Sequence, residues 1–215
     1  IKTAARFLAG SSRLPFSPEL GAGGWLWWKP LFPQDQQFAA RAALMNGVKA
    51  FNLYMLADRE RWYGAPVARD GRKRETFDFY LNLNRFLHEN SFHEYRMRSD
   101  VLLLGIADYE RLEQMQSLLD PLPGFEPCSA LPQDWFVPRT PVPGFRDPIG
   151  AMYKRQWRAM WMGFSQAGFP VTLADSSVEQ AVLDRFPVVA APSFEFMNLR
   201  LQKRLLLYSL KGGVL

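Results

Sequence analysis

Glu19 is the carboxylate in this chain whose neighbours best suit chemistry on a sugar. Glycines follow it, and three tryptophans (Trp25, Trp27 and Trp28) lie a few positions further on. A carboxylate can attack or protonate a glycosidic bond, aromatic faces stack on sugar rings, and glycine lets a backbone approach a ligand closely. The segment therefore predicts a carbohydrate site at Glu19. The alternative is a capping glutamate in a glycine-rich turn, with the tryptophans packed in a core.

A retaining glycosidase needs a second carboxyl group about 5–5.5 Å from the first. Asp58 and Glu60 follow an apolar segment closely and are the nearest candidates in the first part of the chain. No motif supports either one, so we expect the second group elsewhere. Arg59 lies between them and either holds a carboxylate or pairs with Glu60.

The elements around these residues alternate between helix and strand. Apolar periodicity predicts helices over 1–9, 34–46 and 75–89 and strands over 13–18 and 48–55. Phe38, Ala42 and Met45 mark the expected buried face of the second helix, and the second strand is apolar enough to be buried on both faces. This order predicts parallel strands. Segments 19–28 and 58–71 then follow the carboxyl ends of strands, where active sites of such folds lie.

A second alternating unit follows. Strands are expected over 100–106, 171–174, 188–192 and from 214, with helices over 109–119, 153–167, 177–183 and 199–210. Residues 107–150 are rich in proline and read as a long insertion. The stripe of Trp157, Met160, Trp161 and Phe164 is expected to pack in the core. Because no Gly-x-Gly-x-x-Gly follows the first strand, a dinucleotide site is not expected.

Charge and cysteine content exclude several classes of function. The chain has 215 residues and a net charge of +5, and the basic excess lies in residues 1–98. The basic cluster over 59–74 could contact phosphate, but we favour a solvated loop that pairs with its own acids, because no nucleic-acid motif accompanies it. No segment is long and apolar enough to suggest a membrane partner.

Cys128 is the single cysteine, so no disulfide can form within the chain. With two histidines, neither a metal site nor another cofactor is expected. The lone cysteine suits a cytoplasmic protein or a secreted one without disulfides, so the compartment stays open. The chain starts in a helix and stops where a strand begins, and we therefore expect it to be a piece of a longer polypeptide.

Three short segments, in order, resemble the β-galactosidases of glycoside hydrolase families 35 and 42. They are Glu19 with Gly24-Trp25, the run Asn52-Leu-Tyr-Met55, and the segment Tyr63-Gly-Ala-Pro66. The resemblance covers roughly residues 13–90. It implies that these residues end a (β/α)8 barrel, at its seventh and eighth strands. The family's Gly-Gly-Thr-Asn after the eighth strand is replaced here by residues 56–62, and Gly64 replaces its usual Asp.

The resemblance assigns a role to each matching residue. Glu19 matches the catalytic nucleophile, and Tyr63 matches a tyrosine of the sugar pocket. Tyr54, Trp25, Trp62 and Asn52 are the other expected substrate-binding residues. The acid/base glutamate, by the same logic, precedes Ile1.

Residues 100–215 resemble the domain that follows the barrel in family 42. That domain is flavodoxin-like or Rossmann-like, with a class I amidotransferase fold that lacks the catalytic cysteine. Segments 100–104, 186–193 and 211–215 carry the match. It implies a non-catalytic accessory domain over 98–215 that supports homo-oligomer contacts or shapes the rim of the site, after a barrel part over 1–97.

The resulting hypothesis is an α/β chain from a retaining glycoside hydrolase that cleaves terminal β-galactosides through a glycosyl-enzyme on Glu19. The first alternative is a carbohydrate-binding protein on a glycosidase-like barrel that has no catalysis. The second is a small flavodoxin-like or amidotransferase-related interaction protein, which leaves the tryptophan cluster unexplained.

Overall fold

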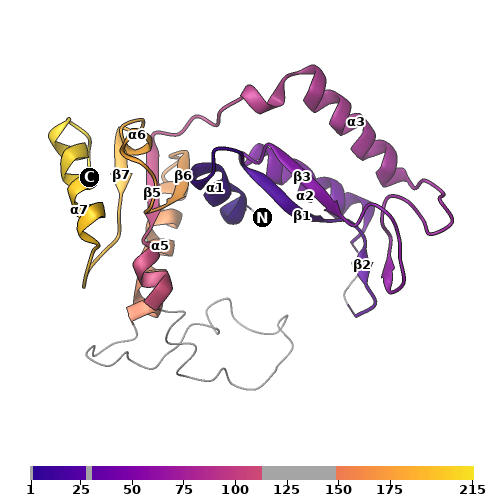
Figure 1. Ribbon diagram of the computed structural model, residues 1–215, viewed down its shortest axis with the longest axis horizontal. Helices are drawn as coiled ribbons and strands as arrows, with labels where there is room; N and C mark the ends of the chain where they lie inside the picture. Colours follow the sequence, from indigo (N-terminus) through magenta and orange to yellow (C-terminus); the bar gives the residue numbers. More distant parts are fainter. Residues whose placement is uncertain (1, 28–30, 113–148) are drawn as a thin grey trace. The chain divides into compact units, whose positions relative to one another are not determined.

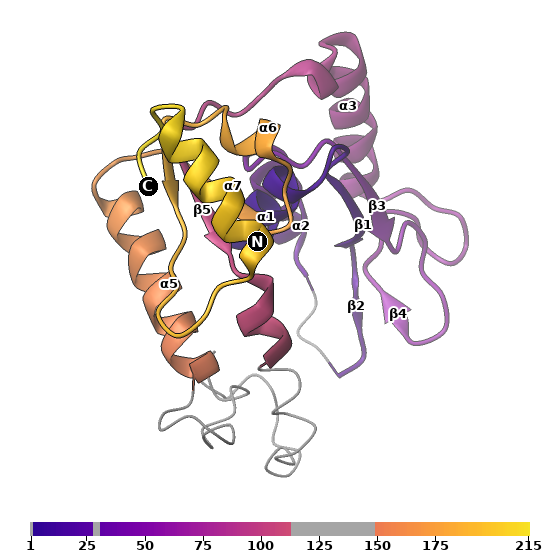
Figure 2. The ribbon, with the colours of Figure 1, turned by 60° about the vertical axis from the view of Figure 1, so that its left-hand side comes forward.

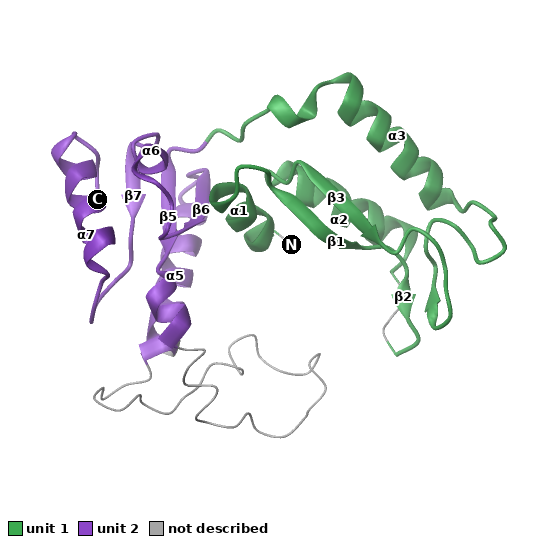
Figure 3. Ribbon diagram, in the orientation of Figure 1, with its two compact units in different colours: residues 1–98 green, residues 99–215 purple. Residues whose placement is uncertain are grey.

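The computed structural model describes residues 2–27, 31–112 and 149–215. They form two compact units, 1–98 and 99–215 (Figure 3). The boundary expected from the sequence lay one residue earlier, after 97. Cys128, Trp28 and most of the expected 109–119 helix lie outside the described residues.

Unit 1 contains two small sheets and three helices longer than one turn. In chain order its elements are α1 (Lys2–Ser11), β1 (Phe16–Gly21), β2 (Gly24–Trp25), α2 (Pro33–Met45), β3 (Ala50–Tyr54), β4 (Trp62–Tyr63), α3 (Glu75–Glu89) and the short 3-10 helix η1 (Phe92–Glu94). β1 pairs with β3 in parallel, and β2 pairs with β4 antiparallel. The expected parallel pairing of the two longer strands is therefore confirmed.

β1 and β3 lie side by side in both views of the ribbon (Figures 1 and 2). One face of this pair packs in a core with residues of α1, α2 and α3, to which Leu20, Phe51 and Leu53 contribute. The expectation that the second strand is buried on both faces is wrong, because Asn52 is exposed. The pair thus has one packed face and one open face.

The helix α2 packs through a different face from the expected one. Ala40, Ala43 and Leu44 are buried, whereas Phe38 and Met45 are 68% and 79% exposed. Small alanine side chains let a helix lie close to its neighbours, and Phe38 and Met45 fall on the opposite stripe. The prediction of the buried face of α2 from its large apolar residues is therefore wrong.

Unit 2 is an α/β segment with a parallel sheet. Its elements are β5 (Val101–Gly105), α5 (Ile149–Gln166), β6 (Val171–Asp175), α6 (Gln180–Leu183), β7 (Val188–Ala190) and α7 (Leu199–Leu210). Residues 107–112 are also helical. The strand order is β6-β5-β7, all parallel, and Val214 bridges to Val188 beside β7. The alternation expected from the sequence is confirmed in this unit.

The core of unit 2 is built on β5, which is buried along its whole length as its apolar sequence predicts. Trp157 of α5 packs against this core, and its indole Nε1 donates a hydrogen bond of 3.1 Å to the carbonyl of Leu104. Trp161 is buried as well. For these two tryptophans, the stripe on α5 is core, as expected.

Candidate active site

Glu19 lies within β1, not after it. The strand was expected over 13–18, but it runs from Phe16 to Gly21. The pairing register steps by three residues in β1, from Ser17 to Leu20, and by two in β3, from Phe51 to Leu53. Pro18 and Glu19 therefore lie together opposite Asn52 in a bulge, which suits a proline because a bulge leaves one residue outside the ladder.

The bulge brings Glu19 and Asn52 to the same face of the strand pair. Leu20 and Leu53 are Cα partners, and both lie in the core. Side chains alternate along a strand, so the residues just before these leucines, Glu19 and Asn52, lie on the open face. Both are exposed. A carboxylate and an amide thus lie next to each other on an exposed face of the strand pair.

Tyr54 continues this open face at the end of β3. It lies two residues after Asn52 and is the Cα partner of Gly21. Its ring packs edge-on against Trp62, with the ring centroids 5.0 Å apart. Trp62 is buried and its Nε1 donates to the carbonyl of Ala22 at 2.9 Å. Trp62 therefore fixes the Tyr54 ring from behind.

The short β2–β4 ribbon holds the other expected aromatic residues. Trp25 is the Cα partner of Trp62, and Tyr63 is the partner of Gly24. Directly opposite residues share a face and consecutive ones do not. Trp25 and Trp62 therefore lie on one face of the ribbon and Tyr63 lies on the other. Trp25 and Tyr63 are 39% and 54% exposed.

Gly23 lets the chain turn from β1 into this ribbon. Its φ is +79°, and a Cβ there would lie 2.6 Å from the carbonyl oxygen of Tyr63 and 2.8 Å from Nε1 of Trp62. Only glycine fits this close approach without strain. The glycine-rich spacing after Glu19 is thus required by packing against β4.

Asp58 is occupied by structural contacts and is not an available acid. Its side chain is 7% exposed and pairs with Arg74 at 2.6 Å, while its other oxygen accepts the backbone N–H of Ala65 at 2.8 Å. Arg74 also donates to the carbonyl of Ala65. These contacts close the loop between β3 and α3. Of the two acids considered for a second role, the exposed Glu60 alone has a free carboxylate among the described residues.

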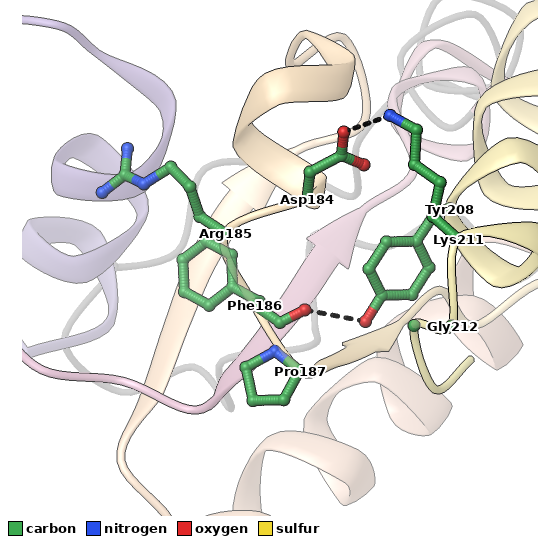
Figure 4. Close-up of a pocket in the computed structure, with 8 residues that line it drawn as sticks. Asp184, Arg185, Phe186, Pro187, Tyr208, Lys211 and Gly212 are labelled. Carbon is green, nitrogen blue, oxygen red and sulfur yellow. Dashed lines mark hydrogen bonds and ion pairs between the residues drawn. The ribbon is translucent and has the colours of Figure 1, made fainter.

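A separate recess of about 330 Å³ lies in unit 2 (Figure 4). Asp184 and Lys211 form an ion pair at its edge, and Tyr208 donates to the carbonyl of Phe186 at 2.9 Å. Figure 4 shows the Arg185 side chain pointing away from this pair. Hydrogen bonds from Lys211 and Gln180 hold the pKa of Asp184 below its usual value. The side chains of Asp184, Lys211 and Tyr208 are thus held by contacts within the unit, which is typical of a structural role.

Two other kinds of site need features that the described part of the chain lacks. Its histidine and acidic side chains nowhere gather in threes that could hold a metal ion. None of its helices has the length and hydropathy needed to cross a bilayer.

Sequence reasoning missed two features around the site. Gln36 is buried, and its Nε2 donates to the carbonyls of Leu31 and Gly64 at 3.1 Å, which ties α2 to the ribbon. Arg59 donates from Nη2 to the Tyr54 hydroxyl at 2.9 Å. Gln36 lies in the polar run from Gln34 to Gln37 at the start of α2, so no local pattern distinguished it from its neighbours.

The fold is similar to that of solved β-galactosidases. A family 42 β-galactosidase from G. stearothermophilus, solved as a catalytic mutant, matches 99% of this chain at 14% identity with a TM-score of 0.61. The β-galactosidase from the psychrophilic Marinomonas ef1 matches 92% at 13% identity and a TM-score of 0.58. The one from Rahnella sp. R3 matches 99% at 15% identity and a TM-score of 0.56.

This chain covers only 27%, 28% and 30% of the Marinomonas, G. stearothermophilus and Rahnella enzymes, respectively. No family model matches it, and neither does any curated protein. At these identities the likeness shows the fold alone, which is a mixed α/β fold shared with part of each β-galactosidase. These structures support a resemblance to glycoside hydrolase family 42 and give no support for one to family 35.

Proposed function

We propose that this chain belongs to a retaining glycoside hydrolase of β-galactosidase type, with Glu19 as its nucleophile. The observation that carries the proposal is the bulge in β1, which places Glu19 beside Asn52 on the open face of a parallel strand pair. The fold shared with β-galactosidases supports the same reading.

In this proposal unit 1 is the last part of a (β/α)8 barrel. The packed face of β1 and β3 is the side that helices cover in such barrels, and the open face lines the interior. Unit 2 is the accessory α/β domain, without chemistry of its own and with a role in homo-oligomer contacts or the rim of the site. The acid/base carboxyl group is carried by a part of the protein outside these 215 residues.

The reaction then proceeds in two displacements. A Glu19 carboxylate oxygen attacks the anomeric carbon, while the acid gives its proton to the departing glycosidic oxygen. This forms a galactosyl ester on Glu19. Water, deprotonated by the same acid/base, attacks the anomeric carbon and releases galactose and the free Glu19 carboxylate. No cofactor takes part in this scheme.

The other proposed residues bind the sugar. The Asn52 amide next to Glu19 is suited to hydrogen-bond a hydroxyl group near the anomeric carbon. Tyr54 lines the same face, and Trp62 supports its ring from the buried side. Trp25 and Tyr63 offer exposed aromatic surface on the β2–β4 ribbon.

The test is covalent trapping on the full-length protein. An activated 2-deoxy-2-fluoro-β-galactoside should esterify Glu19, and peptide mass spectrometry should locate the label there. Glu19→Gln should lower kcat by roughly 10³-fold or more, because the glycosyl ester cannot form. Sugar binding, measured by calorimetry, should stay close to that of the wild type. Glu60→Gln is the matched control, since it removes an exposed carboxylate from the same unit.

A second experiment separates a nucleophile from a merely important residue. In a Glu19→Gly variant, azide can occupy the vacated space and attack the anomeric carbon of an aryl β-galactoside, releasing the phenolate. The expected product is an α-galactosyl azide, with inverted configuration. Absence of both the label and the azide product, with galactose or its gluco and manno relatives, would instead favour the non-catalytic carbohydrate-binding protein.

A further inference from the structure

Arg59 is held at the end of the open face of β1 and β3. Its backbone is fixed by a bridge to Trp62, with N–H···O distances of 3.3 Å and 3.0 Å. Its Nη2 donates to the Tyr54 hydroxyl at 2.9 Å, and its guanidinium carbon lies 5.8 Å from the centre of the Tyr54 ring. Since Tyr54 is itself braced by Trp62, the guanidinium has a defined position.

The charge of Arg59 is not neutralised within the described part of the chain. No carboxylate there lies in ion-pair distance of its guanidinium, and the adjacent Asp58 is already paired with Arg74 and Ala65. A guanidinium has five N–H donors, of which the Tyr54 contact uses one. Arg59 is exposed. Donors and positive charge are therefore available to a ligand.

This cation is held at Tyr54, at one end of the face that carries Glu19. Tyr54 is the Cα partner of Gly21, and Glu19 precedes Gly21 by two residues, so Glu19 and Tyr54 are diagonal neighbours on one face. Diagonal neighbours on one sheet face are about 7–8 Å apart in antiparallel pairs, and we take a similar separation for this parallel pair. A sugar with its anomeric carbon at Glu19 can then extend its C6 group toward the Tyr54–Arg59 pair.

We propose that Arg59, positioned by Tyr54, binds a carboxylate at C6 of the sugar, so that the preferred substrates are β-galacturonides. This inference rests on the proposed function, because it assigns the substrate class of the same site. A planar guanidinium binds a carboxylate through two parallel hydrogen bonds. It also offsets the repulsion between the substrate carboxylate and the Glu19 carboxylate, which would otherwise oppose binding. One guanidinium matches the single charge of a carboxylate better than the higher charge of a phosphate ester.

The test compares three aryl glycosides on the full-length protein: the 4-nitrophenyl β-galactoside, its β-galacturonide and its 6-phosphate. We expect the galacturonide to have the highest kcat/KM, about tenfold or more above that of the galactoside. A hydrogen bond between charged groups stabilises a complex by an amount that corresponds to a ratio of this size. A wild-type preference for the neutral galactoside or for the 6-phosphate would overturn the proposal.

Variants of Arg59 then locate the preference. Arg59→Gln should lower kcat/KM for the galacturonide by about tenfold or more and leave the galactoside nearly unchanged. Arg59→Lys keeps a cation but not the planar guanidinium. Its kcat/KM for the galacturonide should lie between those of the wild type and Arg59→Gln. Arg61→Gln is the control, an exposed arginine of the same loop. An equal loss on both substrates in Arg59→Gln would mean a structural role and would overturn the proposal.

Failure of this inference can be told from failure of the proposed function. The 2-deoxy-2-fluoro analogues of galactose and galacturonic acid are compared as labels of Glu19. If only the galactose reagent labels Glu19, the proposed nucleophile stands and the proposed galacturonide preference is wrong. If neither reagent labels Glu19, both proposals are wrong. Faster labelling by the galacturonic acid reagent, lost in Arg59→Gln, supports both.

Discussion

Replacing Tyr109 by phenylalanine should loosen the segment that follows β7. Tyr109 is fully buried, and its ring stacks on Tyr153 and Phe196 with centroids 4.5 and 4.4 Å away. Its hydroxyl oxygen accepts the backbone N–H groups of Phe194, Glu195 and Phe196 at 3.1, 3.0 and 3.3 Å. Phenylalanine keeps the ring stack and removes the hydroxyl, which also contacts Oγ of Ser193 at 3.3 Å, so the change isolates this one group.

The expected cost follows from the three donors left without their acceptor. A buried donor without a partner costs about 1–3 kcal/mol, so three fully buried ones would cost several times that amount. Phe194 and Glu195 are exposed residues, however, and their N–H groups can turn toward water. We therefore expect a total near 2–3 kcal/mol, well above that of a typical single hydrogen bond.

Hydrogen exchange measured by mass spectrometry is the direct assay. Peptides containing residues 194–196 should exchange roughly 30-fold faster or more in Tyr109→Phe, the ratio that about 2 kcal/mol corresponds to. Tyr208→Phe is the control: Tyr208 is also buried, but its hydroxyl donates to carbonyls, mainly that of Phe186. Carbonyls tolerate the loss of a partner better than N–H groups do, so its cost should stay near 1 kcal/mol.

The pH dependence gives an independent readout. Burial raises the pKa of Tyr109, but its contacts with Ser193 and the three backbone N–H groups lower it more, and the net pKa lies below the usual value. The folded state then releases the proton before the unfolded state does. Stability from this group therefore rises as pH increases toward about 10, the unfolded pKa. The wild-type advantage over Tyr109→Phe should grow over that range.

Unchanged exchange at 194–196, together with a stability difference below that of Tyr208→Phe, would refute this reasoning. It would mean that the ring stack alone holds the segment and that the three N–H groups are satisfied equally well by water.

Three further changes test unit 1. Tyr80→Phe should be neutral or stabilising by about 1 kcal/mol, because the buried Tyr80 hydroxyl has no partner among the described residues. Burial raises the pKa of Tyr80 to about 12, so wild-type stability should fall between pH 10 and 12, and urea titrations should show a smaller fall in the variant. Gly23→Ala should cost about 2–4 kcal/mol through positive φ and the contact with the Tyr63 carbonyl, measured as a loss of thermal stability without aggregation. Asp58→Asn should cost about 2–3 kcal/mol in denaturant titrations, less than a fully buried pair because Arg74 is a third exposed; a cost below 0.5 kcal/mol, as for surface pairs, would show that the loop does not depend on this pair.

The order of elements and the parallel pairing could be predicted from the sequence, because both follow from local periodicity. The helix Glu75–Glu89 was expected at the same bounds, and the apolar run at Val101 was expected as a buried strand. The buried face of α2 was wrong because alanine carries little hydropathy signal but permits close packing. Phe38, which is large and apolar, was expected on the buried face but is exposed.

Contacts between distant residues were beyond sequence reasoning. Asp58 and Arg74 are sixteen positions apart, and nothing in their local patterns distinguishes them from the other charges of a basic loop. The contact between Arg59 and Tyr54 is closer in sequence but needs the turn that bridges Arg59 to Trp62. For the candidate site, the sequence could therefore propose residues but could not show which of them contact one another.

The bulge at Pro18 shows how the register of strand pairing decides which side chains are exposed. Ser17 is the partner of Phe51, whose side chain packs in the core. With regular pairing, Glu19 would lie opposite Leu53 and face that core, and Leu20 would lie opposite Tyr54 on the open face, because a shift of one residue exchanges the two faces. The extra residue reverses both: Leu20 enters the core and the Glu19 carboxylate reaches the surface shared with Asn52. Proline favours this arrangement, since it has no N–H to give to the ladder. The exposure of the Glu19 carboxylate thus depends on its neighbour Pro18, which carries no reactive group itself.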